Sequence, residues 1–283
     1  MLALSLPSSY LNDTPDDDAA GVWRTMIGPP ERALPYLAGL GVGAIEVGDV
    51  RGRADAGAVT QALQVIHDAG LEPHAHLWLP RDFDPSRPPA PLVAAVHGLA
   101  RTPRSGRLRQ RQAACAVHGH HRDTPDAAAA SVRDLRALDP WLRERGARAA
   151  LEVCRFKPDG PIGGTYAEVT ELARAAGDEL GITWDLGHTT WNHHAGHDDL
   201  WPSEHFLARV RHVHVHAVGA NGRTHFALGH GQAPLAGFVE RLLAVGYDGL
   251  WDLEFYPGRW EGSPSARRRA LEGSIARLSE VLA

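Results

Sequence analysis

The sequence predicts an α/β protein folded as a single (β/α)8 TIM barrel over residues 1–283. Eight short apolar, strand-like runs recur along the chain at intervals of roughly 30 to 40 residues. Helical patterns lie between these runs, and an alternation of strand and helix implies parallel strands joined by crossover helices. The chain length of 283 residues also fits a closed barrel of eight such units, for which roughly 250 residues are usual.

The eight expected strands follow one another in order from the N-terminus. They are Leu2–Leu6, Ala44–Val47, His74–Leu79, Ala114–Val117, Ala149–Cys154, Ile182–Leu186, Val210–Val215 and Leu250–Phe255. The first run needs a separate argument, because an apolar N-terminus can also be a signal peptide. Residues 1–7 lack both a basic start and a long apolar stretch, so we expect a strand there.

The helical patterns are clearest in the second half of the chain. They cover Thr165–Leu180, Pro234–Val245 and Pro264–Leu282. The proline-rich segment Pro80–Pro91 is expected to be a strand-to-helix loop on the face that carries the active site.

Glycine and proline mark the expected helix ends. Gly70 and Gly181 are expected to close helices, because the residue that ends a helix often needs a positive φ. Ser263-Pro264 and Thr124-Pro125 are each expected to be an N-cap followed by a first-turn proline.

Charge and composition exclude several classes of protein. The formal net charge is −5, from 29 basic and 34 acidic residues, which argues against general attraction to nucleic acid or to an anionic membrane. The segment Arg101–Arg111 holds five arginines and no acid, and is either an exposed face or a phosphate-binding strip. No apolar run reaches the length of about 18 residues that a membrane span needs. Cys115 and Cys154 lie in expected strands, so we expect buried thiols and a cytoplasmic protein.

Four of the expected strands end in a residue of the kind that binds metal ions. These residues are Glu152, Asp185, His214 and Glu254. Catalytic groups of a (β/α)8 barrel sit at the C-terminal ends of its strands, so the fold would bring the four together. Three carboxylates and an imidazole suit one divalent ion of hard-to-borderline character: Mn²⁺, Co²⁺, Mg²⁺ or Zn²⁺.

The histidine ligand is open between three positions of one strand. His212, His214 and His216 point to the same side, because side chains alternate along a strand. We choose His214 as the residue near the mouth, and expect the other two to be core residues or substrate contacts.

Several motifs together resemble the xylose-isomerase-like barrel superfamily, which includes sugar-phosphate isomerases and epimerases and endonuclease IV. The matching pieces are Glu152 after Ala-Leu, Asp185-Leu-Gly-His188, His-Val-His214-Val, Leu228-Gly-His-Gly-Gln232, and Val245-Gly-Tyr-Asp-Gly-Leu-Trp-Asp-Leu-Glu254. The resemblance is strongest between Glu152 and Tyr256.

The resemblance implies a metal-dependent isomerase or epimerase of a sugar or sugar-like polyol. It places one divalent ion on Glu152, Asp185, His214 and Glu254, and gives the two glutamates a second role in proton transfer next to a carbonyl. His188 occupies a substrate-contacting position. We assign substrate contact also to further side chains of the chain: Glu46, His76, His118, Arg223 and His225. Because barrels of this kind often associate, we expect a homo-oligomer by analogy.

Two other functions stay open. The endonuclease IV branch is a three-zinc phosphodiesterase acting on abasic DNA, and His76, His118 and His225 match its additional ligands. Against it, Arg223 stands where that branch has an aspartate, and a net charge of −5 suits a DNA-binding protein poorly. The third possibility is a barrel that binds a metal or ligand without turnover.

Overall fold

The computed structural model describes residues 1–12, 17–50, 55–101 and 113–283. The arginine-rich stretch at 102–111 lies outside them. Among the described residues, no helix is long and apolar enough to cross a membrane.

Eight parallel strands form a closed barrel in which each strand pairs with the next and β8 pairs with β1. The strands are β1 Leu2–Pro7, β2 Ala44–Val50, β3 Glu72–Trp78, β4 Ala113–His118, β5 Ala147–Glu152, β6 Gly181–Asp185, β7 Val210–Val215 and β8 Trp251–Leu253. All eight runs expected from the sequence are strands, and the predicted (β/α)8 barrel is confirmed.

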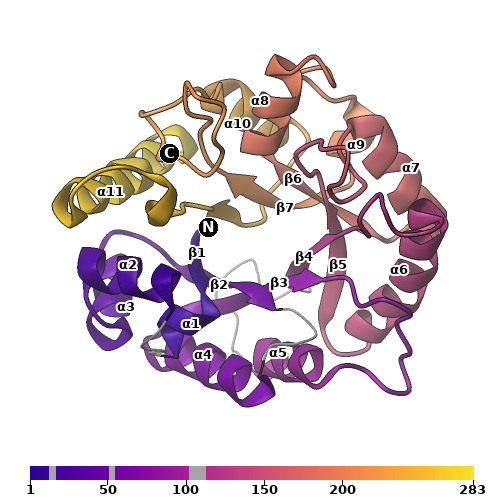
Figure 1. Cartoon of the computed structure of the whole chain (residues 1–283), viewed down its shortest axis with the longest axis horizontal. Helices are drawn as coiled ribbons and strands as arrows, with labels where there is room; N and C mark the ends of the chain where they lie inside the picture. The colour runs from indigo at the N-terminus through magenta and orange to yellow at the C-terminus, as the bar shows by residue number, and fades with distance from the viewer. Residues whose placement is uncertain (13–16, 51–54, 102–112) are drawn as a thin grey trace.

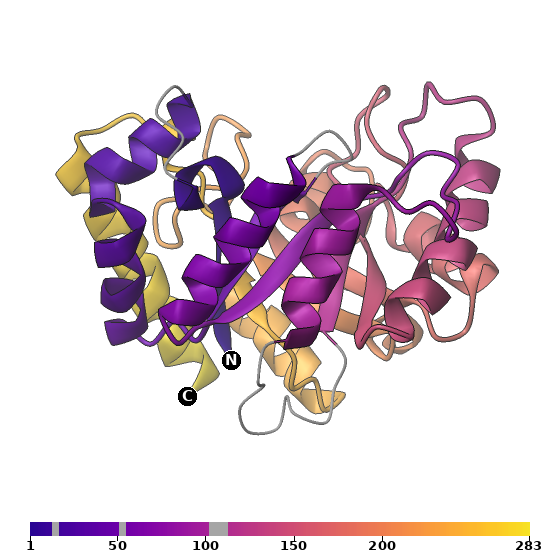
Figure 2. The ribbon, with the colours of Figure 1, turned by 90° about the horizontal axis from the view of Figure 1, so that it is seen from below.

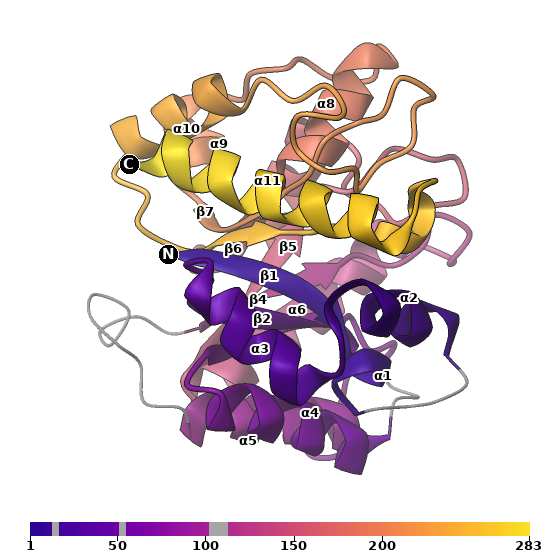
Figure 3. The same ribbon diagram turned by 90° about the vertical axis from the view of Figure 1, so that its left-hand side faces the viewer.

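Helices surround the barrel as an outer ring (Figure 1). They are α1 Ser8–Leu11, α2 Asp18–Ile27, α3 Pro30–Gly39, α4 Ala56–Asp68, α5 Ala90–Arg101, α6 Ala127–Arg143, α7 Tyr166–Ala176, α8 Leu186–His194, α9 Glu204–Leu207, α10 Leu235–Ala244, the 3-10 helix η2 Pro257–Arg259, and α11 Pro264–Leu282. In Figure 2 the purple and magenta helices α4 and α5 lie side by side, and both contact β3. Figure 3 shows the last helix, α11, contacting α2 and α10, which closes the ring.

The expected helix ends are confirmed at two positions and wrong at two. Gly70 follows α4 with a φ of +75°, and Ser263 caps α11 by accepting a hydrogen bond from the backbone of Ala266. In contrast, α7 already ends at Ala176, and Gly181 is the first residue of β6. The helix expected at Thr124 begins at Ala127, because residues 122–126 form turns in which Asp126 has a φ of +50°.

The two faces of the strands differ sharply in polarity. Leucine, isoleucine and valine side chains of the strands pack outward against the helices in one continuous core. Bulky apolar residues usually dominate the interior of such a barrel, but here a set of polar side chains is buried on the strands: Ser5, Glu46, His74, His76, Glu152, Thr183, Asp185, His212, His214 and Asp252. A buried carboxylate or imidazole requires a partner, so this interior is built for more than packing.

Candidate active site

A cavity of about 770 Å³ opens where the strands end. Its wall includes residues at or after the ends of strands on several sides of the barrel, among them Trp78, His118, Glu152 and Glu254. The proline-rich loop after β3 leaves the barrel at this same end, as expected. The cavity is therefore in the position where (β/α)8 barrels carry their catalytic groups.

Four buried atoms converge below this cavity. Nδ1 of His214 lies 3.7 Å from Oε2 of Glu152 and 3.9 Å from both Oδ2 of Asp185 and Oε2 of Glu254. None of the four side chains is more than 4% exposed. The nearest neighbours of the three carboxylate oxygens are histidine nitrogens: Nε2 of His118 lies 3.0 Å from Oε2 of Glu152, Nδ1 of His188 lies 3.1 Å from Oδ2 of Asp185, and Nε2 of His225 lies 3.0 Å from Oε2 of Glu254. Ligands that each lie about 2.1 Å from a shared cation are roughly 3 to 4 Å apart, so this spacing fits one ion.

The three carboxylates are held in their ionised form. Burial opposes ionisation, but the nearby imidazoles of His118, His76 and His214 keep the pKa of Glu152 well below its usual range. In the same way, His225 and His214 keep the pKa of Glu254 well below its usual range, again against burial. Deprotonated carboxylates are the form that binds metal ions and accepts protons.

Asp185 is fixed by its own helix. Its Oδ1 caps α8 by accepting a hydrogen bond from the backbone of His188 at 2.6 Å, and Nε2 of His216 lies 3.1 Å from the same oxygen. These two groups occupy Oδ1, while Oδ2 lies 3.1 Å from Nδ1 of His188 and 3.9 Å from Nδ1 of His214. Gly187 makes this arrangement possible, because a Cβ at that position would lie 1.9 Å from atoms of the His216 ring.

The orientation of His214 is set from below by Glu46. Nε2 of His214 lies 3.1 Å from Oε1 of Glu46, and Nε2 of His212 lies 3.0 Å from Oε2 of the same carboxylate. Ser5 and Asp252 complete this lower group, with the Ser5 hydroxyl donating to Asp252. His212 is therefore a deep residue, His216 holds Asp185, and His214 is the histidine of β7 whose Nδ1 faces the carboxylates.

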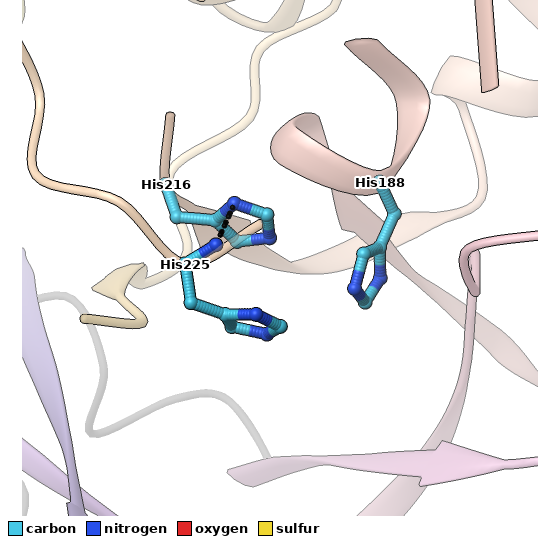
Figure 4. A group of neighbouring side chains, drawn as sticks. All are labelled: His188, His216 and His225. Atoms are coloured by element: carbon cyan, nitrogen blue, oxygen red, sulfur yellow. Dashed lines mark hydrogen bonds between the residues drawn. The ribbon is translucent and has the colours of Figure 1, made fainter. Parts of the chain in front are cut away.

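Three further histidines surround the Asp185 side of the cavity (Figure 4). His188 comes from the first turn of α8, His216 follows β7, and His225 lies in the loop before α10. The rings of His216 and His225 stack with centroids 4.3 Å apart, and the backbone of His225 donates to Nδ1 of His216 at 3.0 Å. His225 has a φ of +65°, an unusual conformation for a non-glycine residue that is common at functional sites.

His76 and His118 lie on the opposite side of Glu152. Their Nε2 atoms are 3.1 Å and 3.0 Å from Oε2 of Glu152, and 3.1 Å from each other. Burial disfavours the charged imidazolium, but Glu152 and Glu46 raise the pKa of His76 to about 9. In the metal-free protein a protonated His76 thus neutralises part of the carboxylate charge.

Most of the expected site residues come together at or just below the cavity, but four of them do not line it: Glu46, Asp185, His214 and Arg223. His76, His118, His188 and His225 do line its wall. Glu46 is completely buried under His214. The Arg223 backbone closes a tight turn, donating to Asn221 and accepting from Gly219.

The sequence reasoning missed Arg155, Tyr256 and Arg259, which all line the cavity. Tyr256 donates a hydrogen bond to Oε1 of Glu254 at 3.0 Å, and Arg259 donates to Nδ1 of His225 at 2.8 Å. The available signal was position: each of the three follows within five residues of Glu152 or Glu254, in the loops that line the mouth of such a barrel.

Comparisons with known proteins agree with this architecture. The family model described as xylose isomerase-like TIM barrel matches residues 34–280. D-psicose 3-epimerase from Clostridium cellulolyticum H10, solved with D-tagatose, is 14% identical over 99% of each chain, with a TM-score of 0.64. D-allulose 3-epimerase from Methylomonas sp., in complex with D-allulose, is 16% identical over 99% of this chain and 96% of its own, with a TM-score of 0.62.

A xylose isomerase domain protein from Alicyclobacillus acidocaldarius has the same fold. It is 17% identical over 100% of this chain and 98% of its own, with a TM-score of 0.60. No curated protein sequence matches the chain. At such identities the solved structures establish a shared fold, and the chemistry has to be argued from the residues of this chain.

Proposed function

The chain belongs to the xylose isomerase-like TIM barrel family, and from this premise we propose that it isomerises or epimerises a sugar or a sugar-like polyol with one divalent metal ion. The solved proteins that share its fold include 3-epimerases of D-allulose and D-psicose. The reaction class we propose is proton transfer next to a carbonyl.

The observation that carries this proposal is the convergence of three buried carboxylate oxygens, from Glu152, Asp185 and Glu254, on Nδ1 of His214. Burying several carboxylates together is costly unless their charge is compensated by a cation or by hydrogen bonds. Three carboxylate oxygens in one place also repel one another. A divalent cation would remove both penalties, and three oxygens with one nitrogen suit Mn²⁺, Co²⁺, Mg²⁺ or Zn²⁺.

The two glutamates are the groups we propose for proton transfer. Both line the cavity, both are ionised, and they come from β5 and β8, so they approach a substrate from different directions. Tyr256 holds Oε1 of Glu254, and Oε2 lies between Nε2 of His225 at 3.0 Å and Nδ1 of His214 at 3.9 Å. The bound ion would act as a Lewis acid on the substrate carbonyl and stabilise the negative charge left when the neighbouring proton is removed. Two carboxylates on different sides of that carbon can remove and return the proton.

His225 is arranged to contact substrate as an uncharged group. Burial is the main cause that lowers its pKa to about 4, although Glu254 opposes this shift. His188 lines the same wall, and the indole of Trp78 contributes an apolar surface. This mixture of flat apolar and polar groups suits the alternating C–H and O–H groups of a sugar.

The test combines metal content, thermal stability and hydrogen exchange. Protein purified without chelator is expected to contain one divalent ion per chain and to melt at lower temperature after chelation, because a ligand that binds only the folded state stabilises it. Metal-loaded protein incubated in D₂O with a panel of ketoses and inososes is expected to incorporate deuterium next to the carbonyl. An absence of metal together with an unchanged melting temperature contradicts the proposed metal site.

A second candidate is a multinuclear phosphodiesterase. It is favoured by two further groups of potential ligands that adjoin the first: His76, His118 and Glu152, and His188, His216 and His225. Two or three ions per chain, loss of metal in both His76→Asn and His118→Asn, and cleavage of an abasic-site duplex abolished by Glu254→Gln would together establish it. For a sugar isomerase we expect the Asn variants to keep their metal and raise KM instead.

A further inference from the structure

Two arginines line the same cavity as the proposed metal ligands, and each follows one of the two proton-transferring glutamates. Arg155 comes three residues after Glu152, and Arg259 comes five residues after Glu254, at the end of η2. The loops after β5 and β8 therefore each supply one carboxylate to the floor and one guanidinium to the wall of the cavity.

Neither guanidinium is neutralised by the protein. The Arg155 guanidinium lies 3.9 Å from the centre of the Trp191 ring, and that of Arg259 lies 5.1 Å from the centre of the Tyr256 ring. Arg259 also donates to the neutral Nδ1 of His225. Within the described parts of the chain, no ion pair joins either arginine to a carboxylate, and Nε of Arg155 is buried without a hydrogen-bond partner.

The two positive charges act on each other. Arg155 and Arg259 line the same cavity, and burial and then the charge of Arg259 lower the pKa of Arg155. Lys157 lines the same wall. Two aspartates, Asp17 and Asp159, also line the cavity. The carboxylate of Asp17 caps α2 by accepting from the backbone of Ala20 at 2.9 Å, and within the described residues Asp159 forms no ion pair with either arginine. Paired guanidiniums without acidic partners are the usual means of holding a phosphate or carboxylate group.

We propose that Arg155 and Arg259 form a subsite for an anionic group of the substrate, a phosphate or a carboxylate. The sugar part of this substrate rests on the proposed function. His225 connects the two regions, since its Nδ1 accepts from Arg259 and its Nε2 lies 3.0 Å from Oε2 of Glu254. The anion would thus be held one imidazole ring away from a proposed metal ligand. At this separation one small molecule could place its anionic group on the arginines and its carbonyl group at the proposed metal site.

The test measures anion binding without turnover. Inorganic phosphate and acetate are titrated into metal-loaded protein by calorimetry, for the wild type and for Arg155→Gln and Arg259→Gln. The control is Arg32→Gln, an exposed arginine of α3 that does not line the cavity. A charge-assisted hydrogen bond is worth about 1.5–3 kcal/mol, so each cavity variant is expected to weaken phosphate binding about tenfold or more. Melting curves establish that the variants are folded.

The two probes distinguish the two sources of the anion. Much tighter binding of phosphate than of acetate indicates a sugar phosphate, and comparable binding indicates a sugar acid. If the wild type binds neither probe, the subsite does not exist. The same conclusion follows if phosphate binds both cavity variants as well as it binds Arg32→Gln, because phosphate would then be binding to the metal alone. This result is independent of the proposed reaction, since deuterium exchange on neutral sugars can persist without the subsite, and anion binding can persist without exchange.

Discussion

Two layers of charged side chains lie inside this barrel, and they differ in how their charge is balanced. The lower layer consists of Ser5, Glu46, His212 and Asp252, and these groups engage one another: Glu46 is approached by Ser5, His212 and His214. The upper layer consists of Glu152, Asp185 and Glu254, each of which directs one oxygen toward Nδ1 of His214 beneath an open cavity. His214 belongs to both layers, with Nε2 directed downward and Nδ1 upward.

The difference shows that a cluster of metal-type residues is not by itself a metal site. Glu46, His212, His214 and Asp252 are also close enough to share an ion. However, burial and then the charge of Glu46 raise the pKa of Asp252 well above its usual range, which favours the protonated acid. The lower layer is balanced by protons, whereas the upper layer is the one that we propose to bind a cation. The lower layer then serves to hold the imidazole of His214 in place.

The largest expected effect comes from the proton-transferring carboxylates of the upper layer. Glu152→Gln and Glu254→Gln should each lower turnover about 10²- to 10⁴-fold, because an amide cannot accept the proton. Initial rates on the substrate found by deuterium exchange measure this. Glu240→Gln, at an exposed position of α10, is the matched control. Near-normal turnover in both cavity variants would disprove the assigned roles.

A smaller effect is expected one layer below. Glu46→Gln should weaken metal affinity about 10- to 100-fold, since it removes the charge that orients the ligand without touching the ion. Competition with a chelator of known affinity measures the change. An unchanged affinity would mean that Glu46 has no part in positioning His214.

The pH dependence of stability can distinguish whether protons or a metal ion balance the charge of the upper layer. In the metal-free protein Glu152 and Glu46 raise the pKa of His76 from 6.5 to about 9. When folding raises a pKa, the stability gained is complete at pH values below the pKa in the unfolded chain, and it is lost as the pH rises through the pKa in the folded protein. For His76 this range lies between about 6.5 and 9, and the stability lost amounts to up to about 3 kcal/mol.

Chelated protein should therefore melt at progressively lower temperature over this range. Metal-loaded protein should not, because ion binding strengthens as its ligands lose protons. Melting curves at several pH values measure both. The fall should be smaller in chelated His76→Asn, where His188 and His214, whose pKa values are also raised, still contribute. A fall as large as that of the wild type would assign it to other groups.

The smallest effect is expected at Asp252, in the lower layer. The raised pKa of Asp252 favours its neutral form, so Asp252→Asn should replace one neutral group by another of similar shape and change stability by less than about 1 kcal/mol. Metal affinity should stay at the wild-type value. Denaturant unfolding and the chelator competition measure both quantities, and a loss of several kcal/mol would show that the lower layer needs an ionised Asp252.

The fold was predictable because the pattern of an apolar strand followed by a helix is repeated along the chain. Apolar runs such as Val210–Val215 need only alternate with helical segments for the closed barrel to follow. The misplaced helix ends have local causes. Gly181 has the position of a helix stop in the sequence, but α7 had already ended at Ala176, and a glycine is equally suited to begin β6 beside the Arg211 side chain.

The site residues that lie at strand ends could be predicted from the sequence, whereas those positioned by loops could not. Glu152, Asp185 and Glu254 lie at strand ends, so their convergence follows from the barrel. Arg223 was expected at the cavity because it lies two residues before His225. Instead it belongs to a tight turn, in which its backbone donates to Asn221, and it does not line the cavity. Arg259 reaches His225 from a different loop, a pairing between distant segments that no pattern in a single sequence reveals. A cytoplasmic location and a homo-oligomer stay predictions.

The close contact between Gly187 and the His216 ring has a consequence for how this site can change. The Asp185-Leu-Gly-His188 motif looks like a local turn, yet its glycine is required by a side chain twenty-nine positions further along the chain. Related barrels with a larger residue at position 187 are therefore expected to carry a smaller one at position 216. In a library randomised at both positions, active clones should show this compensation, so that the residues at positions 187 and 216 covary.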